Sequence, residues 1–341
     1  MKAAVRHAYG PPDVLRIEEV PKPTPRDDEV LIRVHAASVN LGDWELLTGK
    51  PLYCTVLAQL FAPKPRRDVA SSERKRGIFK PKYEILGSDI AGHVEAVGRS
   101  VTQFRSGDEV FGDCGISGFG AFAEYVCVPE KAVLVPKPAR MTFEQAAAIP
   151  QAAFIALKAL RDKARVQPGQ KVLINGAGGG AGTFAVQIAK SHGAEVTGVD
   201  GPSKLDMLRS IGADHVIDYT REDFTRNGQR YDAILDLAAH RTISESRRSL
   251  TPNGIYLVAG GSWTATWQSA FLGPLISKTG NGRVALLAAG WSREDLTLMI
   301  ELFEAGKVVP VIDRCYPLGE AGEALRRLGE KRSQGKVIIT P

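Results

Sequence analysis

A run of glycines followed by one carboxylate is the part of this chain whose residue types and spacing most clearly indicate chemistry. Five of the seven residues from 176 to 182 are glycine, and Asp200 follows eighteen residues after the last of them. Residues without a Cβ let the backbone approach a pyrophosphate, and the first turn of a helix offers unpaired N–H groups. A carboxylate about 20 residues further on can bind a ribose. The pattern predicts a dinucleotide site, with its pyrophosphate at Gly179, Gly180, Ala181 and Gly182.

The segments around this turn alternate in the way that such a site requires. Apolar runs predict strands at 171–175, 195–199, 215–217, 232–236, 254–259 and 283–288. Helices are expected between them at 181–191, 203–210, 241–249 and 267–277. This order predicts an α/β Rossmann domain, a doubly wound parallel six-stranded sheet.

The first 130 residues have a different pattern. Short β-branched runs, separated by Gly, Pro and Asp, occur at 29–34, 91–97, 108–111 and 123–128. Strands of this length and spacing predict a small β-barrel-like domain. Because the glycine turn lies in the middle of the chain, we expect the nucleotide domain at 131–290, inserted between two parts of the β domain at 1–130 and 291–341.

A basic segment at about 62–82 interrupts the β domain. The simplest interpretation is a solvated surface insertion, although such a charge could also bind an anionic surface or a phosphorylated ligand. No aromatic residues are interleaved to form a nucleic-acid platform, so no nucleic-acid partner is expected.

Composition narrows the class of protein. The 341 residues are 44% hydrophobic and 24% charged, with a net charge of +6, which is ordinary for a globular chain of roughly two domains. No apolar window is long enough for a membrane span, and the N-terminus lacks a signal-peptide core. The four cysteines form no Cys-x-x-Cys pair. We therefore expect a cytoplasmic protein with reduced thiols.

Several segments, in this order, resemble the medium-chain dehydrogenase/reductase superfamily. They are 37–43 (ASVNLGD), 85–98 (ILGSDIAGHVEAVG), 107–112 (GDEVFG), 120–126 (GAFAEYV), 146–160, the glycine turn, 212–219 (GADHVIDY) and 335–339 (GKVII). The resemblance covers nearly the whole chain except the basic insertion. It implies a GroES-like β-barrel catalytic domain beside the Rossmann domain, and a homo-oligomer, either a dimer or a tetramer.

The chain is most similar to the zinc-free branch of quinone oxidoreductases (zeta-crystallin-like) and enone reductases. In zinc-dependent relatives a Cys, a His and a second Cys bind the catalytic metal. The corresponding positions here carry Asn40 and the segment Gly87-Ser88-Asp89, and the helix that would carry the third ligand has no Cys from 150 to 160. Because zinc prefers thiolate and imidazole ligands, no metal is expected. The lone His93 is expected to be structural.

Without a metal to stabilise an alkoxide, the resemblance implies hydride transfer to a conjugated acceptor, a quinone or an α,β-unsaturated carbonyl. It places Asn40 by the nicotinamide ribose or the substrate oxygen, although Asn40 could also simply form a turn. Asp43 could belong to the same site or cap a helix. Tyr53 could donate a proton or a hydrogen bond to an enolate, and water could do so equally well.

The resemblance also implies cofactor contacts beyond the glycine turn. Asp200 would favour NAD(H), whereas Lys204 could pair with the 2′-phosphate of NADP(H) or face solvent, so the choice between NADPH and NADH stays open. Tyr219 is expected near the adenine. Four more residues are expected at the cofactor: Ala259, Gly260, Gly261 and Lys336.

Two departures from the family pattern bear on function. Ile155 stands where relatives often have Thr, and residues 236–239 (DLAA) replace Asp-Asn-Val-Gly. The loss of two polar contacts predicts weaker or altered nucleotide binding. It also keeps an alternative open, a non-catalytic nucleotide-binding sensor or structural protein of the same fold. A biosynthetic enoyl reductase or dehydrogenase is the other alternative.

Overall fold

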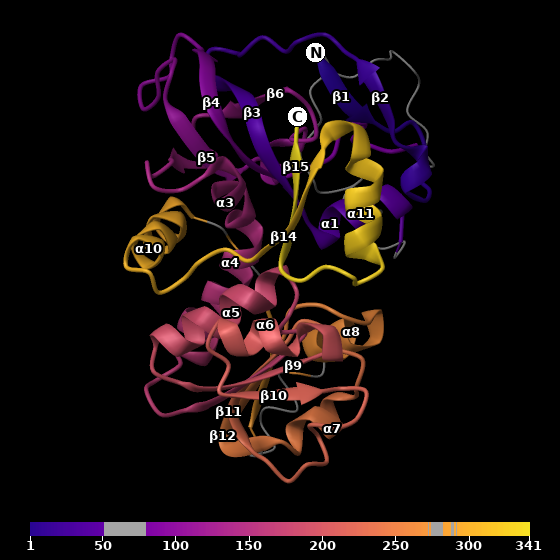
Figure 1. The fold of residues 1–341 in the computed structure, drawn as a ribbon, viewed down its shortest axis with the longest axis vertical. Helices are drawn as coiled ribbons and strands as arrows, with labels where there is room; N and C mark the ends of the chain where they lie inside the picture. The colour runs from indigo at the N-terminus through magenta and orange to yellow at the C-terminus, as the bar shows by residue number, and fades with distance from the viewer. Residues whose placement is uncertain (51–79, 272, 274–281, 288–289, 291) are drawn as a thin grey trace. The chain divides into compact units, whose positions relative to one another are not determined.

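The pairing of strands and the clustering of contacts divide the chain into two units. The computed structural model describes residues 1–50, 80–271, 273, 282–287, 290 and 292–341 (Figure 1). Unit 1 comprises Met1–Gln151, Ser292–Thr297 and Ile312–Pro341. Unit 2 comprises Ala152–Trp291 and Leu298–Val311.

Unit 2 is built on a six-stranded sheet whose strand pairs are all parallel. Its strands are β8 (Lys171–Asn175), β9 (Glu195–Asp200), β10 (His215–Asp218), β11 (Tyr231–Asp236), β12 (Leu250–Val258) and β13 (Arg283–Leu286). They lie in the order β10-β9-β8-β11-β12-β13. The order runs outward from β8 in both directions, which is the doubly wound arrangement. The predicted α/β class and six-stranded sheet are confirmed.

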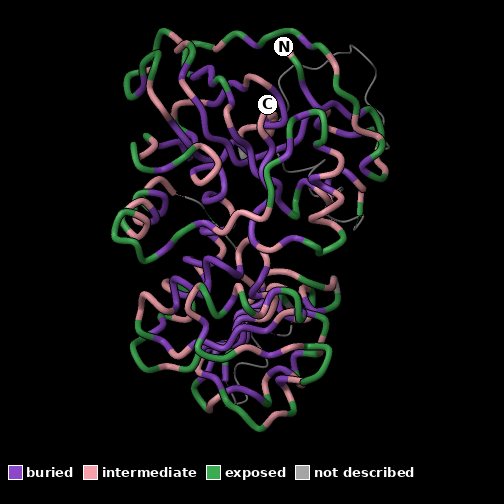
Figure 2. The backbone as a smooth tube through the Cα atoms, viewed as in Figure 1, coloured by how far each residue is buried: buried purple, intermediate pink, exposed green. Residues whose placement is uncertain are grey.

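Helices cover this sheet. They include α5 (Gly180–Ser191), α6 (Leu205–Ser210, after a 3-10 turn η4 at Pro202–Lys204), α7 (Ile243–Arg247) and α8 (Trp263–Phe271). Helices α5 and α6 contact β8, β9 and β10, whereas α7 and α8 contact β12 and β13. Right-handed crossovers that run in opposite directions from β8 place these two pairs on opposite faces. The inner strands β8, β9 and β11 are therefore largely buried on both sides, which explains their apolar runs, whereas the edge strands β10 and β13 are partly exposed (Figure 2).

Unit 1 is rich in β-structure. A two-stranded sheet pairs β1 (Lys2–Val5) with β2 (Arg16–Glu19). The larger sheet has the order β14-β15-β3-β4-β5-β7, and β6 also pairs with β3. Its strands are β3 (Glu29–Val39), β4 (Asp89–Val97), β5 (Glu109–Asp113), β6 (Tyr125–Pro129), β7 (Val133–Pro136), β14 (Ile312–Pro317) and β15 (Lys336–Thr340).

Strand β15 and strand β4 flank the end of β3 in the larger sheet. Strand β15 pairs antiparallel with the end of β3, with Ile338 opposite Ser38. Strand β4 pairs with the other side of β3, with Asp89 opposite Ser38. The end of β3 therefore lies between the beginnings of β4 and β15, which are far apart in sequence.

The remaining helices are α1 (Leu41–Thr48), α3 (Phe143–Ala148), α4 (Pro150–Leu157, continued as a π-helix η3 at Lys158–Ala164), α10 (Arg293–Glu304) and α11 (Ala321–Gly329). Shorter 3-10 turns are η1 (Pro12–Val14), η2 (Gly115–Ser117) and η6 (Leu318–Glu320). Pro150 begins α4, because the first turn of a helix tolerates its missing N–H.

The division between the units differs from the expected ranges 1–130, 131–290 and 291–341. Residues 131–151 fall in unit 1, because β7 pairs with β5 and α3 packs on β3 and β4. Residues 298–311 fall in unit 2. There the amide of Gln187 exchanges two hydrogen bonds with the backbone of Val309, at 3.0 and 2.8 Å.

None of the helices in the described ranges has the length and hydrophobicity needed to span a bilayer.

Candidate functional site

The glycine turn of unit 2 joins the end of β8 to the N-terminus of α5. Gly176 turns the chain with a φ of +80°, and its N–H donates to the carbonyl of Val199 at 3.0 Å. Gly179 is the N-cap of α5 and offers no capping side chain. The N–H groups of the first turn, at Gly180, Ala181 and Gly182, thus have no side-chain cap and can bind an anion.

Close packing explains why the turn needs glycine. A Cβ on Gly182 would lie 2.3 Å from the carbonyl oxygen of Gly176 and 2.5 Å from that of Ala177. A Cβ on Gly179 would meet only the Gly176 oxygen, at 3.5 Å. Gly182 is therefore required by the fold itself, whereas Gly179 leaves space above the helix N-terminus.

Asp200, at the end of β9, is held by the turn. Its Oδ2 accepts from the N–H of Gly178 at 2.7 Å, and its Oδ1 accepts from the N–H of Gly201 at 2.8 Å. Lys204 Nζ lies 3.4 Å from Oδ1, and both side chains are about one-tenth exposed. The carboxylate thus orients the glycine turn, and an ammonium group offsets its charge.

The other cofactor candidates of unit 2 lie at the same carboxyl edge of the sheet. Tyr219 is 58% exposed, and its ring lies beside Gly201, next to Asp200. Gly261 has a φ of +109°, and a Cβ on Gly260 would lie 2.7 Å from the Leu237 carbonyl oxygen. Together with Ala259 they follow β12, so the structure brings these residues to the edge where doubly wound sheets bind ligands.

Asp236, the first residue of the 236–239 segment, makes buried contacts at this edge that the sequence did not predict. Asp236, at the end of β11, accepts from Asn175 Nδ2 and from the Tyr256 hydroxyl, both at 2.7 Å. Burial raises the pKa of Asp236, and these two hydrogen bonds oppose the shift. The contacts tie the ends of β8, β11 and β12 together. The sequence signals of these contacts are the position of Asp236 at the end of an apolar run and its place in the 236–239 motif.

The second candidate site is a cluster of polar side chains in unit 1, which we call the unit-1 polar cluster. It comprises Ser38, Asn40, Asp43, Ser88, Asp89, Gln151 and Lys336. All except Gln151 are buried. Three of them lie at the ends of β3, β4 and β15, Ser88 directly precedes β4, Asn40 and Asp43 lie at the start of α1, and Gln151 is the second residue of α4.

Lys336 stands at the centre of this cluster, in unit 1, whereas the other cofactor candidates lie in unit 2. Its Nζ is 2.5 Å from Asn40 Oδ1 and 3.6 Å from Asp89 Oδ2. Burial lowers the pKa of Lys336 and raises the pKa of Asp89, and the two charges partly offset each other. Ser38 also donates to Asp89, at 2.8 Å.

Asp43 joins the cluster through backbone hydrogen bonds at the start of α1. Its carboxylate accepts from the backbone N–H of Asn40 at 2.9 Å and of Gly87 at 3.0 Å. Asp43 forms a capping box with Asn40 at the start of α1. Burial raises its pKa to about 7, although both backbone hydrogen bonds favour the carboxylate. The structure thus brings Asn40 and Asp43 together, while Tyr53 lies outside the described residues.

The residues at the positions that resemble the zinc ligands of related dehydrogenases include Asn40, Ser88 and Asp89, with Gln151 beside them. Asn40 and Ser88 are joined by a 3.2 Å hydrogen bond, and Gln151 donates to Ser88 at 2.8 Å. Two amides, a hydroxyl and the carboxylate of Asp89 stand there, with neither a thiolate nor an imidazole. In the part of the chain that the structure describes, no group of three His, Cys, Asp or Glu residues could hold a metal ion.

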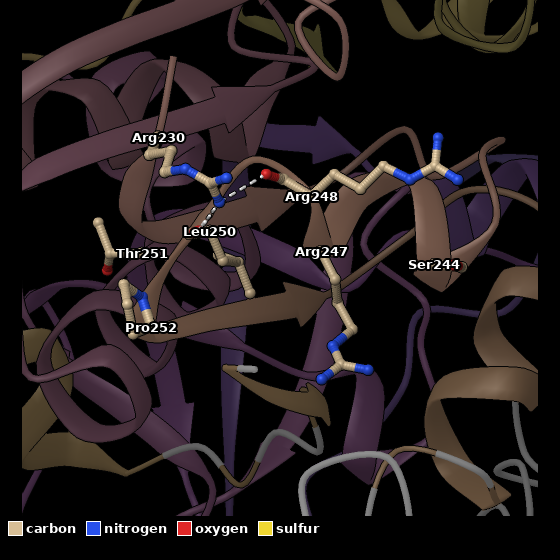
Figure 3. Close-up of a pocket in the computed structure, with 7 residues that line it drawn as sticks. All are labelled: Arg230, Ser244, Arg247, Arg248, Leu250, Thr251 and Pro252. Atoms are coloured by element: carbon tan, nitrogen blue, oxygen red, sulfur yellow. Dashed lines mark hydrogen bonds between the residues drawn. The ribbon is translucent and has the colours of Figure 1, made fainter. Parts of the chain in front are cut away.

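A basic pocket of about 660 Å³ lies at the opposite edge of the unit-2 sheet (Figure 3). Arg230 precedes β11, and its guanidinium donates to the carbonyls of Arg248 and Leu250, both at 3.0 Å. Figure 3 shows the side chains of Arg247 and Arg248 pointing in different directions. Because it lies at the amino ends of the strands, this pocket is no part of the glycine-turn site.

Comparisons with known proteins show which family the chain belongs to. The family described as "Alcohol dehydrogenase GroES-like domain" matches residues 26–139, and "Zinc-binding dehydrogenase" matches residues 211–339. The chain is 30% identical to the chloroplast envelope quinone oxidoreductase homolog of Arabidopsis thaliana, over 95% of this chain and 93% of that protein. It is 31% identical to 2-methylene-furan-3-one reductase of Solanum lycopersicum, over 100% of this chain and 79% of that protein. The quinone oxidoreductase structure from Coxiella burnetii superposes with a TM-score of 0.84 at 28% identity, covering 100% and 99% of the two chains.

Proposed function

This chain belongs to the medium-chain dehydrogenase/reductase superfamily, in its quinone and enone oxidoreductase branch, and we propose that it is a zinc-independent, NAD(P)H-dependent reductase. Its substrate is a quinone or an α,β-unsaturated carbonyl compound. Relatives named quinone oxidoreductase and 2-methylene-furan-3-one reductase match over at least 95% of the chain. The observation that carries the proposal is the glycine turn, whose uncapped helix N-terminus and carboxylate suit a dinucleotide.

The residues of unit 2 fit a dinucleotide. The first-turn N–H groups of α5 would hold its pyrophosphate, and Gly260 and Gly261 would let it approach the backbone after β12. Tyr219 would lie by its adenosine end. The reduced nicotinamide supplies the hydride, and the protein supplies position and exclusion of water.

Both NADPH and NADH suit the acidic end of this site. A free carboxylate at the end of the second strand would repel a 2′-phosphate. Asp200, however, already accepts two backbone N–H groups, and Lys204 lies 3.4 Å away. The ammonium therefore reduces the repulsion and could pair with a 2′-phosphate. We expect comparable kcat/KM values with the two cofactors.

The unit-1 polar cluster suits a reaction without a metal. Hydride addition to a conjugated carbonyl places negative charge on the substrate oxygen, which hydrogen-bond donors can stabilise. The cluster contains such a donor, the partly exposed side-chain amide of Gln151. A cytoplasmic location and a homo-oligomer stay predictions.

The first test is turnover without metal. NADPH and NADH oxidation would be followed at 340 nm with a panel of quinones and enones, in excess EDTA and after dialysis against it. We expect turnover that survives chelation, at similar kcat/KM for both cofactors. Activity that disappears with EDTA and returns with zinc would overturn zinc independence. Dinucleotide binding by titration without turnover of any panel member would favour the sensor or structural alternative.

A further inference from the structure

Gln151 holds a position that the sequence did not single out. It is the second residue of α4, and its backbone N–H donates to Asp89 Oδ1 at 3.2 Å. Its side-chain Nε2 donates to Ser88 Oγ at 2.8 Å. These two contacts fix both ends of the residue against the unit-1 polar cluster. Gln151 is the one member of that cluster that is partly exposed.

Asn40 has no donor left for a ligand. Its Oδ1 accepts from Lys336 Nζ at 2.5 Å, and its Nδ2 donates to Asp89 Oδ2 at 2.9 Å and to Ser88 Oγ at 3.2 Å. An amide nitrogen carries two hydrogens, and both are used inside the protein. Lys336, Asp89 and Asn40 therefore determine one another's orientation.

Ser88 connects Asn40 to Gln151, because its hydroxyl oxygen accepts a hydrogen bond from each amide. Ser88 is 1% exposed and accepts from both amides, so its hydroxyl oxygen is occupied within the protein. The second N–H of Gln151 has no hydrogen-bond partner among the residues that the structure describes. If the Gln151 amide were turned over, its oxygen would accept from the Ser88 hydroxyl, and both N–H groups would be available. In either orientation at least one donor remains.

We propose that Gln151 is a catalytic residue whose available amide N–H binds the carbonyl oxygen of the substrate. This inference rests on the proposed function. As a hydride adds to the β-carbon of an enone, the C=C electron pair shifts toward the oxygen, and the Gln151 N–H stabilises that enolate. A proton from water then adds to the α-carbon. The substrate gains two electrons and two hydrogens in total, and the nicotinamide is oxidised. Ser88, Asn40 and Lys336 act as positioning residues.

The test replaces the amide by a side chain of similar size. Gln151→Leu should lower kcat/KM for an enone or a quinone by about 100-fold, the usual effect of removing one oxyanion donor. The dissociation constant for NADPH should stay at the wild-type value. The matched control is Gln145→Leu on α3, where the lost contact is a capping box with Thr142. This control should lower the thermal midpoint and leave kcat/KM unchanged.

A second variant distinguishes the loss of the hydrogen-bond donor from a change in side-chain packing. Gln151→Glu keeps the shape but carries a donor only when its carboxyl group is protonated. Its kcat/KM relative to wild type should therefore rise as the pH falls, and a merely structural role would not produce this profile.

The outcomes distinguish the two proposals. A wild-type enzyme that reduces enones, with Gln151→Leu equally active, would overturn the role of Gln151 and leave the proposed function standing. If kcat/KM falls equally in Gln151→Leu and in Gln151→Glu at every pH, the hydrogen-bonding role of Gln151 is also overturned, because a change in packing would explain both losses. A wild-type protein that binds NADPH but reduces no quinone or enone would overturn both.

Discussion

Asp43 shows how a single buried carboxyl group makes stability depend on pH. Its folded-state pKa is raised to about 7 by burial, and the unfolded chain releases the same proton near pH 4. The contribution of this group to the free energy of unfolding is therefore fully present below about pH 4, and it is lost as the pH rises through about 7. We expect the free energy of unfolding to fall across that window, by up to about 1.4 kcal/mol per pH unit.

Chemical denaturation of wild type and Asp43→Asn at several pH values measures this slope. The variant should show a flatter profile, even though it weakens one of the two backbone hydrogen bonds and is less stable overall. Asp28→Asn, at an exposed position, is the matched control and should keep the wild-type slope. An Asp43→Asn profile as steep as that of wild type would show that this carboxyl group does not titrate there.

At the residue scale, sequence could place some site residues but not their partners. Asn40 and Asp43 are close in sequence; the resemblance suggested a site role for Asn40, and for Asp43 either the same site or a helix cap, and the structure shows the two in one capping box. Lys336 lies 296 residues from Asn40, and the sequence suggested a cofactor contact for it. Gln151 was missed because its contact with Ser88 depends on where α4 begins. Side-chain contacts across strands and helices follow from tertiary pairing, which local patterns do not specify.

At the scale of the β8–α5 element, substitutions at Gly182 and Gly179 distinguish a packing requirement from a role in cofactor binding. Gly182→Ala places a methyl group 2.3 Å from the Gly176 carbonyl oxygen, so it should lower the thermal midpoint and weaken NADPH binding together. Gly179→Ala has room in the free protein but narrows the approach to the N-terminus of α5. It should keep the thermal midpoint and raise the NADPH dissociation constant about tenfold, a cost of about 1.4 kcal/mol.

Thermal melting and fluorescence titration of the two variants test this pair. Wild-type NADPH affinity in Gly179→Ala would contradict a pyrophosphate site at the start of α5. A loss of stability in Gly179→Ala equal to that in Gly182→Ala would show that packing governs both positions.

At the scale of elements, the sequence predicted the doubly wound sheet well, because strands buried on both faces have continuous apolar runs. Helix α11 was not predicted individually, although Ala321, Ala324 and Leu325 follow the spacing of an amphipathic helix. Strand β3 extends five residues beyond the predicted end at 34. Its last part pairs with β15, a contact between distant parts of the chain that local residue patterns do not reveal.

At the scale of the whole molecule, each unit has a hydrophobic core of its own. One core joins β3, β4, β5 and β15 of unit 1, including Ile32, Ile90 and Ile339. Another joins strands of unit 2, including Leu173, Ile234 and Tyr256. The glycine turn and its cofactor candidates lie in unit 2, whereas the unit-1 polar cluster lies in the other. A ligand that binds the glycine turn therefore stabilises unit 2 directly.

Amide hydrogen exchange with and without NADPH tests this separation. At an NADPH concentration of 100 times its dissociation constant, binding adds about 2.7 kcal/mol to the free energy of unfolding of the unit that binds it. We expect exchange to slow by about 100-fold for amides of β8, β9 and β11 that open only with that unit, since 1.4 kcal/mol is a factor of ten. Amides of β4 and β5 should exchange as in the free protein. Equal slowing in β4 and β5 would show that the two cores open together. No slowing in β8 and β9 would contradict a dinucleotide site at the glycine turn.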